Sequence, residues 1–316
     1  MIDLRHVLAV TAVVTIAPGV APAQAPCDPL PPPSGPVIEQ YPADADILRA
    51  TIAGAASGTT ILLHDGVYDM SGGDSTHRLV FSTPGLTLRS ASGNREAVIL
   101  DGNYGTNELI SIYASNTTIA DLTLRRAFDH PIHASGPFNT PISGLLIHNV
   151  HVIDPGQQAV KINPNGTGTV DDSTLQCSHL ELTDAGRTHI RDSCYTGGLD
   201  AHAATGWLVR RNLIEGFWCP TGLSEHGIHM WRLCQDSIVE ENVVIDCARG
   251  IGFGLGPGGD GHLRCIIRNN FIAASDAGLF ASTAGFDSGI SLWGADDAEV
   301  YHNTVASTQT PSASSI

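Results

Sequence analysis

The sequence predicts an all-β chain that folds as a right-handed parallel β-helix of about eight turns, with a capping helix at its N-terminal end. Apolar residues alternate over short stretches in a chain of 34 glycines, without any long helical period. An Asn, Asp or Ser also recurs every 28 to 34 residues, just before such a stretch. The recurring residues are Asp121, Asn149, Ser178, Asn212, Asn242, Asn270 and Asn303.

Each repeat carries three strand-like runs, which predicts one turn of a coil with three parallel sheets. A single turn cannot bury a core alone, so each turn must stack on the one before it. Asn tolerates the left-handed conformation of a tight corner, and stacked Asn side chains can hydrogen-bond along the coil axis. The recurring Asn is therefore interpreted as a corner residue.

The start of the chain is interpreted as targeting sequence. Residues 1–25 form a secretory signal peptide, with an apolar run over residues 7–17 and an A-x-A cleavage pattern at residues 23–25. The run is too short to span a membrane, and no later segment is long enough. Residues 26–42 are a Pro-rich lead-in. We therefore expect a secreted or periplasmic protein without a membrane span.

Residues 43–316 are predicted to form a single β-helix domain. Within it, residues 44–55 are expected to be an amphipathic helix that covers the open N-terminal edge of the sheets. Its apolar face holds Leu48, Ile52 and Ala55 with Ile47 beside them, and Asp44 or Asp46 is its N-cap. No polar cover follows the last repeat, so we expect the C-terminal end to be truncated.

Charge and cysteine content narrow the function. The formal net charge is −16, which disfavours a nucleic-acid partner. Lys161 is the only lysine in the chain. Seven cysteines suit an oxidising compartment, and six of them lie in the second half of the chain. Their order suggests bridges Cys177–Cys194 and Cys219–Cys234, although sequence alone does not fix the connectivity.

One family of strand-like runs carries the candidate site. Its members are residues 109–113, 131–135, 159–163, 198–202, 227–231, 250–254 and 289–293. One parity is apolar in every run and faces the core, so the other parity faces outward. The first outward column is Ser111, His133, Lys161, Asp200, His229, Gly252 and Ser291. The second is Tyr113, Ser135, Asn163, His202, Trp231, Gly254 and Trp293.

Neighbouring rungs of such a coil lie about 4.8 Å apart, so the outward residues of several rungs can touch one substrate residue. The turns before two of these runs are long, which is typical of binding loops. Residues 184–197 bring Arg191 and Tyr195 towards the site, and residues 215–226 bring Glu225 and His226. The glycines between Trp231 and Trp293 leave a bare rung that can hold sugar rings.

Over residues 43–305 the chain resembles the pectin-lyase-like superfamily of secreted β-helices. The segment "GLDAH" resembles the G-x-D-x-H core of secreted mannuronan C5-epimerases, with Asp200 and His202 on its Asp and His. Ala201 replaces the usual proline, and Gly197 stands where the family has a tyrosine. The resemblance implies a polysaccharide substrate, and Lys161 fits the basic residue that neutralises a uronate carboxylate in such sites.

The predicted function is that of a polysaccharide lyase or C5-epimerase, which abstracts the proton α to a uronate carboxylate. Lys161 with Arg232 or Arg191 would neutralise charge, His202 or His229 would be the base, and Tyr195 or the other histidine the acid. Asp200 would orient a histidine. The expected catalytic set is Lys161, Asp200, His202, His229 and Tyr195. The expected binding set is His133, Asn163, Arg191, Glu225, His226, Trp231, Arg232 and Trp293.

Three other functions stay open. A glycoside hydrolase needs two carboxylates, and Asp200 is the only acid in the two outward columns unless Glu225 swings in. A transition metal can be bound by His202, His229 and either His133 or His226, and Asp171–Asp172 is a candidate calcium site. A non-catalytic glycan-binding solenoid is the third. In every case the expected partner is a polysaccharide and the protein a monomer.

Overall fold

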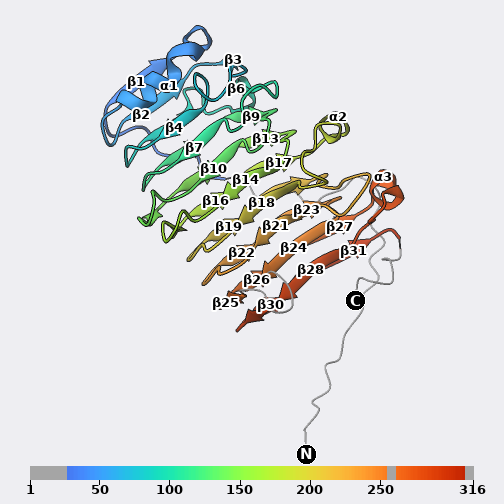
Figure 1. Cartoon of the computed structure of the whole chain (residues 1–316). Helices are drawn as coiled ribbons and strands as arrows, with labels where there is room; N and C mark the ends of the chain where they lie inside the picture. The colour runs from blue at the N-terminus through green and yellow to red at the C-terminus, as the bar shows by residue number, and fades with distance from the viewer. Residues whose placement is uncertain (1–26, 255–260, 310–316) are drawn as a thin grey trace, which may run out of the picture.

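The computed structural model describes residues 27–254 and 261–309, so the predicted signal peptide lies outside the described residues. Three long parallel sheets wind around one core, and each turn of the chain adds one strand to each sheet (Figure 1). We call them sheets A, B and C. Parallel strands joined in this way take the right-handed crossover. The predicted β-helix is therefore confirmed.

The strands of each sheet follow one another along the coil axis. Sheet A contains β1 (Val37–Gln40), β2 (Thr60–Leu63), β5 (Thr87–Ser90), β8 (Thr118–Ala120), β12 (Leu146–His148), β16 (Thr174–Gln176), β19 (Leu208–Arg210), β22 (Ile238–Glu240), β26 (Ile266–Arg268) and β30 (Glu299–Tyr301). Sheet B contains β3 (Gly66–Asp69), β6 (Val98–Asp101), β9 (Thr123–Arg125), β13 (His151–Ile153), β17 (His179–Glu181), β20 (Leu213–Glu215), β23 (Val243–Ile245), β27 (Phe271–Ala274) and β31 (Thr304–Ser307).

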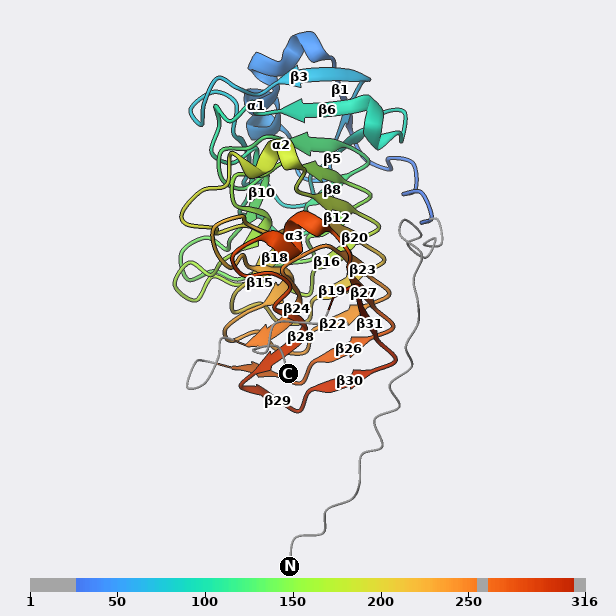
Figure 2. The same ribbon diagram turned by 90° about the vertical axis from the view of Figure 1, so that its right-hand side faces the viewer.

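Sheet C carries the candidate site. It contains β4 (Leu79–Phe81), β7 (Ile110–Ile112), β10 (Ile132–Ala134), β14 (Gln158–Ile162), β18 (Gly197–Ala201), β21 (His226–Met230), β24 (Arg249–Gly254) and β28 (Ser288–Trp293). Two short pairs flank the long sheets, β11 (Ile142–Ser143) with β15 (Val170–Asp171) and β25 (His262–Leu263) with β29 (Ala295–Asp296). Short helices α2 (Asp184–Arg187) and α3 (Ala277–Ala281) lie in the turns before β18 and β28 (Figure 2).

The register of sheet C is the one that the sequence alignment predicts. Val160 pairs with Leu199, and Leu199 pairs with Ile228, all three fully buried. Lys161 therefore lies beside Asp200, and Asp200 beside His229. β4 adds one rung before the first run that the alignment recognised.

The N-terminal end is closed by α1 (Ala45–Gly54), which follows a 3-10 turn at Pro42–Asp44 (Figure 1). Leu48 and Ile52 are buried in the core as expected, whereas Ile47 is 53% exposed. Asp44 is the N-cap residue of α1, but its carboxylate accepts the Tyr41 N–H at 2.8 Å instead of capping α1. β1 pairs with β2, so sheet A begins within the segment expected to be lead-in.

The predicted ladder of hydrogen-bonded asparagine side chains exists, but these asparagines are not themselves the left-handed corner residues. Asn212, Asn242 and Asn270 form a chain in which each Nδ2 donates to the next Oδ1, at 2.9 Å. The left-handed residue, however, is the one before each of these asparagines, for example Glu241 with φ 56°. Asp121 and Asn149 occupy that left-handed position themselves, at φ 55° and 50°. The recurring residues therefore belong to two adjacent positions, and the sequence spacing alone did not separate them.

Substitution of a ladder asparagine is expected to destabilise the coil strongly. Asn242 is buried and donates from Nδ2 to Val209 O at 3.0 Å, while its Oδ1 accepts from the backbone and side chain of Asn212. Because each lost bond costs about 1 kcal/mol, Asn242→Ala should lower the free energy of unfolding by about 3 kcal/mol. Denaturant unfolding measures this loss.

Asn269→Ala is the matched control, because Asn269 is the exposed left-handed residue at the next corner, with φ 55°. Its substitution should cost only about 1 kcal/mol, the strain of a left-handed alanine. Equal losses for the two variants would contradict a stabilising role for the ladder.

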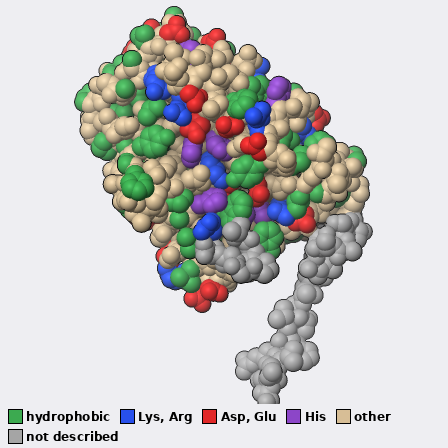
Figure 3. Space-filling view, in the orientation of Figure 1, with side chains coloured by type: hydrophobic (Ala, Val, Ile, Leu, Met, Phe, Trp, Pro, Cys, Tyr) green, Lys and Arg blue, Asp and Glu red, His purple; other side chains and the backbone are tan. Residues whose placement is uncertain are grey.

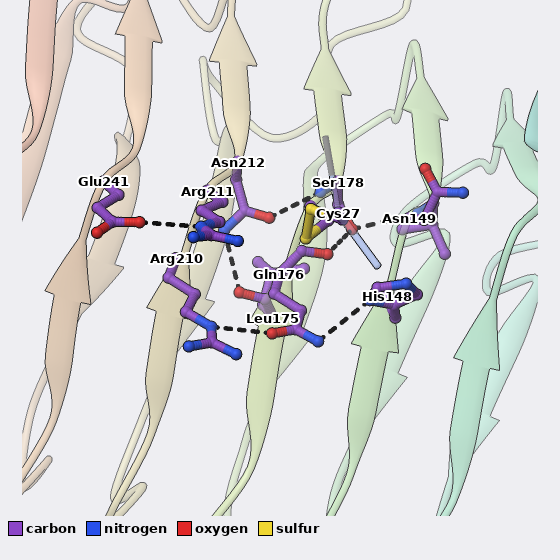
Figure 4. The surroundings of a disulfide bond; sticks show 12 residues. Cys27, His148, Asn149, Leu175, Gln176, Ser178, Arg210, Arg211, Asn212 and Glu241 are labelled. Carbon is purple, nitrogen blue, oxygen red and sulfur yellow. Dashed lines mark hydrogen bonds and ion pairs between the residues drawn. A yellow bond between two sulfur atoms is a disulfide. The ribbon is translucent and has the colours of Figure 1, made fainter. Parts of the chain in front are cut away.

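The disulfides differ from those predicted. Cys27 pairs with Cys177, and Cys194 pairs with Cys219. Cys177 is a corner residue with φ 61°, and the start of the described chain reaches it there, beside Asn149 and Ser178 (Figure 4). Cys194 and Cys219 lie in the loops before β18 and β21, which are neighbouring rungs. Each bridge joins two cysteines that are consecutive in the sequence, but the pairing begins at Cys27 and is therefore shifted by one cysteine from the predicted pairs.

The remaining described cysteines, Cys234, Cys247 and Cys265, are buried free thiols. Burial raises the pKa of Cys234 to about 12, so this thiol stays protonated and unreactive.

No helix of the described residues is long and apolar enough to cross a membrane.

Candidate functional site

Histidines gather with acidic and basic side chains in a strip down the middle of one face of the molecule (Figure 3). The strip follows the outward residues of sheet C. Buried polar atoms of the described residues that lack a hydrogen-bond partner also gather here: both imidazole nitrogens of His226, Nδ1 of His229, both amide atoms of Gln158, Nε2 of His133 and the indole nitrogen of Trp231. Such atoms each cost about 1–3 kcal/mol unless water or a ligand meets them, which marks this face as a candidate site.

Lys161 is the centre of the site. Its Nζ donates to Tyr195 OH at 2.8 Å, lies 3.2 Å from His202 Nε2, and forms an ion pair with Asp200 Oδ2. The Lys161 ammonium also lies 5.9 Å from the centre of the Trp231 ring. β14 and β18 hold Lys161 and Asp200 side by side, while Tyr195 comes from the loop just before β18. We call Lys161, Tyr195, Asp200 and His202 the lysine cluster.

Asp200 is an anion at neutral pH. Its burial alone would raise the pKa of the carboxyl group, but the adjacent His202 imidazole and the charge of Lys161 outweigh burial and lower the pKa to about 2. His202 Nε2 lies 3.3 Å from Asp200 Oδ1. Burial, together with the charge of Asp200, raises the pKa of Tyr195. Tyr195 is therefore a neutral phenol, which can donate a proton but is a poor base.

The three N–H donors of the Lys161 ammonium have three partners within the protein, namely Tyr195, Asp200 and His202. The side chain of Lys161 is only 5% exposed. A substrate carboxylate can therefore reach this ammonium only if one partner gives way. The role predicted from the sequence, direct neutralisation of a uronate by Lys161, requires that exchange.

His226 and His229 face the same side of sheet C, although they are three residues apart in one strand. A Cβ on Gly227 would contact the core residue Val244 at 2.9 Å, so Gly227 points inward. Ile228 is fully buried and points inward as well. Two consecutive inward residues interrupt the alternation of the strand, so the residues on either side both point outward. Ser288 and Ser291 repeat this arrangement, with their hydroxyls 2.7 Å apart.

His226, His229 and Glu225 form a second group on the adjacent rung. The two imidazole rings lie 4.2 Å apart, centre to centre. Glu225 Oε2 is 3.3 Å from His229 Nδ1 and 4.0 Å from His226 Nδ1. Burial lowers the pKa of His226 well below its usual value, so this ring is neutral. We call these three residues the histidine pair with Glu225.

The bare rung expected between Trp231 and Trp293 is filled. His229 stacks on Trp231 at 4.7 Å, and the edge of His226 meets Trp293 at 5.8 Å. A Cβ on Gly252 would lie 2.4 Å from His226 Nε2, so this position is glycine because the His226 ring takes the space. The expectation of a sugar ring between the two tryptophans is therefore wrong.

A carboxylate missed in the sequence extends the strip in the other direction. Glu108 Oε1 lies 2.5 Å from His133 Nδ1, and Glu108 Oε2 accepts from Ser111 Oγ. Burial would raise the pKa of Glu108, but the hydrogen bond and charge of His133 lower it to about 2. Burial lowers the pKa of neighbouring His130 to about 4. Glu108 precedes β7 in a turn, so strand alternation did not reveal it.

Three further residues of the expected binding set are exposed or half-buried. Arg191 is exposed and stacks on Phe128 at 3.8 Å. Arg232 is exposed in the turn after β21, and Asn163 is half-buried just after β14. In the candidate calcium pair, both carboxylate oxygens of Asp171 accept hydrogen bonds, from Thr169 Oγ1 and from the backbone of Thr205.

A cavity of about 630 Å³ lies elsewhere, beside the Cys27–Cys177 disulfide at the corner between sheets A and B. Three arginines line it, Arg89, Arg95 and Arg211. Each is paired with an acid, namely Asp121, Glu96 and Glu241 respectively. Each arginine of this cavity therefore has an acidic partner, whereas several buried nitrogen atoms on the face of sheet C have no hydrogen-bond partner.

No protein-family model matches the sequence, and no curated protein matches it. Among solved structures, the chain is similar to an alginate lyase from Paenibacillus at 11% identity and a TM-score of 0.47, covering 87% of this chain and 99% of that one. Pectate lyase Pel9A is similar at 12% identity and a TM-score of 0.44, covering 86% of this chain and 78% of that one. The A-module of the mannuronan C-5 epimerase of Azotobacter vinelandii follows at 14% identity and a TM-score of 0.28, covering 87% and 94%.

The strand order and register of the molecule itself decide its class. Sheets A, B and C are parallel throughout, one strand per turn enters each of them, and the apolar residues of successive rungs stack into one continuous core. By this architecture the chain is a right-handed parallel β-helix.

Proposed function

We propose that the protein is a secreted enzyme that acts on a uronate-containing polysaccharide, by lyase or C5-epimerase chemistry at the lysine cluster. The observation that carries the proposal is the convergence of a phenol, a carboxylate and an imidazole on one buried ammonium, Lys161 Nζ. These are the groups that proton abstraction next to a carboxylate requires: an acid, a base and a fixed charge. The "GLDAH" resemblance supports a uronate as substrate.

His202 is the base in this proposal. Its side chain is 19% exposed, whereas His229 is 1% exposed and donates from Nε2 to Gly254 O, 3.0 Å away. The C5–H bond breaks, His202 takes the proton, and the electron pair passes into the carboxylate of the sugar. Lys161 stabilises the charge that develops there once the approaching carboxylate replaces His202 as its third partner. Asp200 keeps Lys161 and His202 in place.

Tyr195 is the acid. In a lyase, the electron pair then forms the C4–C5 double bond, the C4–O bond breaks, and the leaving oxygen takes the phenol proton. In an epimerase, the phenol proton is delivered to C5 from the opposite face. The raised pKa of Tyr195 keeps that proton on the phenol until it is needed.

Glycoside hydrolysis is the less favoured reaction. It requires one protonated carboxyl group as general acid beside a second carboxylate. Asp200 and Glu108 both have a pKa lowered to about 2, so neither holds a proton at neutral pH.

The two disulfides are consistent with the proposed secretion, because they persist in oxidising compartments.

A panel of uronate polysaccharides tests the proposal. The full-length mature protein is incubated with alginate, pectate and glucuronan, and the products are followed by proton NMR. We expect either unsaturated chain ends or inversion at C5 on at least one polymer. New reducing ends without either signal would favour a hydrolase. No change in any polymer, with binding retained, would favour the glycan-binding alternative and overturn the proposal.

A further inference from the structure

We propose that Glu225, His226 and His229 bind a divalent transition-metal ion, with zinc as the natural occupant. The three residues each offer one donor atom, and these atoms all lie within 4.8 Å of one another. β21 carries both histidines outward because Gly227 and Ile228 both point inward. The site goes beyond the proposed proton transfer, since its residues are not those of the lysine cluster.

The hydrogen bond of His229 to the backbone identifies its free nitrogen. Nε2 lies 3.0 Å from Gly254 O, and a carbonyl oxygen can only accept, so Nε2 carries the hydrogen. In the neutral His229 ring, Nδ1 then carries a lone pair, and this nitrogen faces Glu225 Oε2 at 3.3 Å. Two acceptors at this distance repel each other unless a cation lies between them. A ring nitrogen that donates to a backbone carbonyl while the other binds a metal is the usual arrangement of a metal-ligating histidine.

His226 provides the second, independent observation. It is fully buried, and neither of its ring nitrogens has a hydrogen-bond partner. Leaving a buried polar atom unpaired costs about 1–3 kcal/mol, so the ring is held at this place at the expense of stability. Gly252 leaves the space that His226 occupies, since a Cβ there would lie 2.4 Å from His226 Nε2. The position is thus built to hold an imidazole against His229 and Glu225.

Two imidazole nitrogens and one carboxylate oxygen are a donor set that suits zinc, which accepts three protein ligands and keeps a fourth position for water or substrate. His202, a metal candidate from the sequence, is not a ligand, because its Nε2 faces Lys161 Nζ at 3.2 Å. His133 is also excluded, since it lies three rungs away from His229 along sheet C. A bound ion would add positive charge on the rung next to Asp200.

A second group in the described part of the chain has similar composition and serves as the control. His151, His179 and Glu181 also lie within reach of a common ion. Their nitrogens are already satisfied, however: His151 is paired with Glu96 and Glu181 at 3.0 and 3.1 Å, and His179 with Glu215 at 2.8 Å. In this control group, carboxylates contact the imidazole nitrogens, whereas at the histidine pair with Glu225 a metal ion would take that place.

Metal binding by the full-length mature protein tests the proposal without any assay of activity. The protein is stripped with a chelator, loaded with zinc chloride, desalted, and analysed for metal content and affinity. Loading with cobalt(II) gives a visible absorption spectrum that reports nitrogen and oxygen ligands. We expect about one zinc ion per chain. Glu225→Gln and His226→Asn should each weaken binding at least about 100-fold, the upper range for the loss of a mere supporting group.

His179→Asn should leave zinc affinity unchanged. Circular dichroism verifies that each variant is folded, and the conservative, partly exposed Glu225→Gln keeps the test valid if His226→Asn does not fold. The proposal is overturned if the native protein retains no zinc at millimolar loading. It is equally overturned if His179→Asn removes the ion while Glu225→Gln retains it.

Discussion

Lys161→Met is expected to abolish turnover on the responsive polymer and to destabilise the fold. The ammonium holds Tyr195, Asp200 and His202 together, so its loss removes the charge and misplaces the acid and the base. We expect kcat/KM to fall by about 1,000-fold or more. The buried Asp200 carboxylate also loses its ion-pair partner, which should lower the free energy of unfolding by about 3–5 kcal/mol.

Two controls separate these effects. The double variant Lys161→Met/Asp200→Asn removes the unpaired charge, so stability should recover while activity stays lost. Arg211→Met breaks the exposed pair with Glu241 at the corner between sheets A and B and should cost less than about 1 kcal/mol, without loss of activity. A kcat/KM for Lys161→Met within tenfold of the native value would contradict the assigned role of the lysine.

His202→Asn is expected to lower kcat by about 100- to 10,000-fold, which is the range for loss of a general base. The fold should be nearly unaffected, because Lys161 remains bound to Asp200 and Tyr195. Steady-state kinetics and denaturant unfolding, measured on the same preparation, give the two quantities. A large loss of activity at unchanged stability distinguishes a base from a structural histidine.

His64→Asn is the matched control. His64 stacks on Tyr41 at 4.2 Å near the N-terminal end of the coil, far along the chain from the lysine cluster. This variant should retain native kinetics. If His202→Asn also retains them, proton abstraction must be assigned to another group.

The sequence predicted the rungs of the coil because apolar side chains repeat with period two and every turn must stack on the last. That register places Lys161 beside Asp200, and Asp200 beside His229, as the structure confirms. Strand alternation could not predict the outward turn of His226. The signal for it was present, as a glycine one residue before each inward apolar residue in four successive rungs: Gly198, Gly227, Gly250 and Gly289.

Other features depend on loops, where period two carries no information. Glu108 lies in a turn, and its pairing with His133 follows only from the folded coil. The disulfides join consecutive cysteines, but only the folded coil brings Cys27 to Cys177, so the prediction, which left Cys27 unpaired, was shifted by one cysteine. Saturation of the Lys161 ammonium by three partners is a matter of side-chain rotamers, which composition and spacing do not determine.

The most direct test of proton abstraction at the lysine cluster is a kinetic isotope effect on a uronate polymer deuterated at C5. Lyase and epimerase chemistry both break the C5–H bond. We therefore predict that the deuterated polymer reacts several-fold more slowly in single turnover, and that Lys161→Met and His202→Asn turn over neither polymer appreciably. Equal single-turnover rates for the protiated and deuterated polymers, with products formed, would show that C5–H cleavage is not the chemistry of this site.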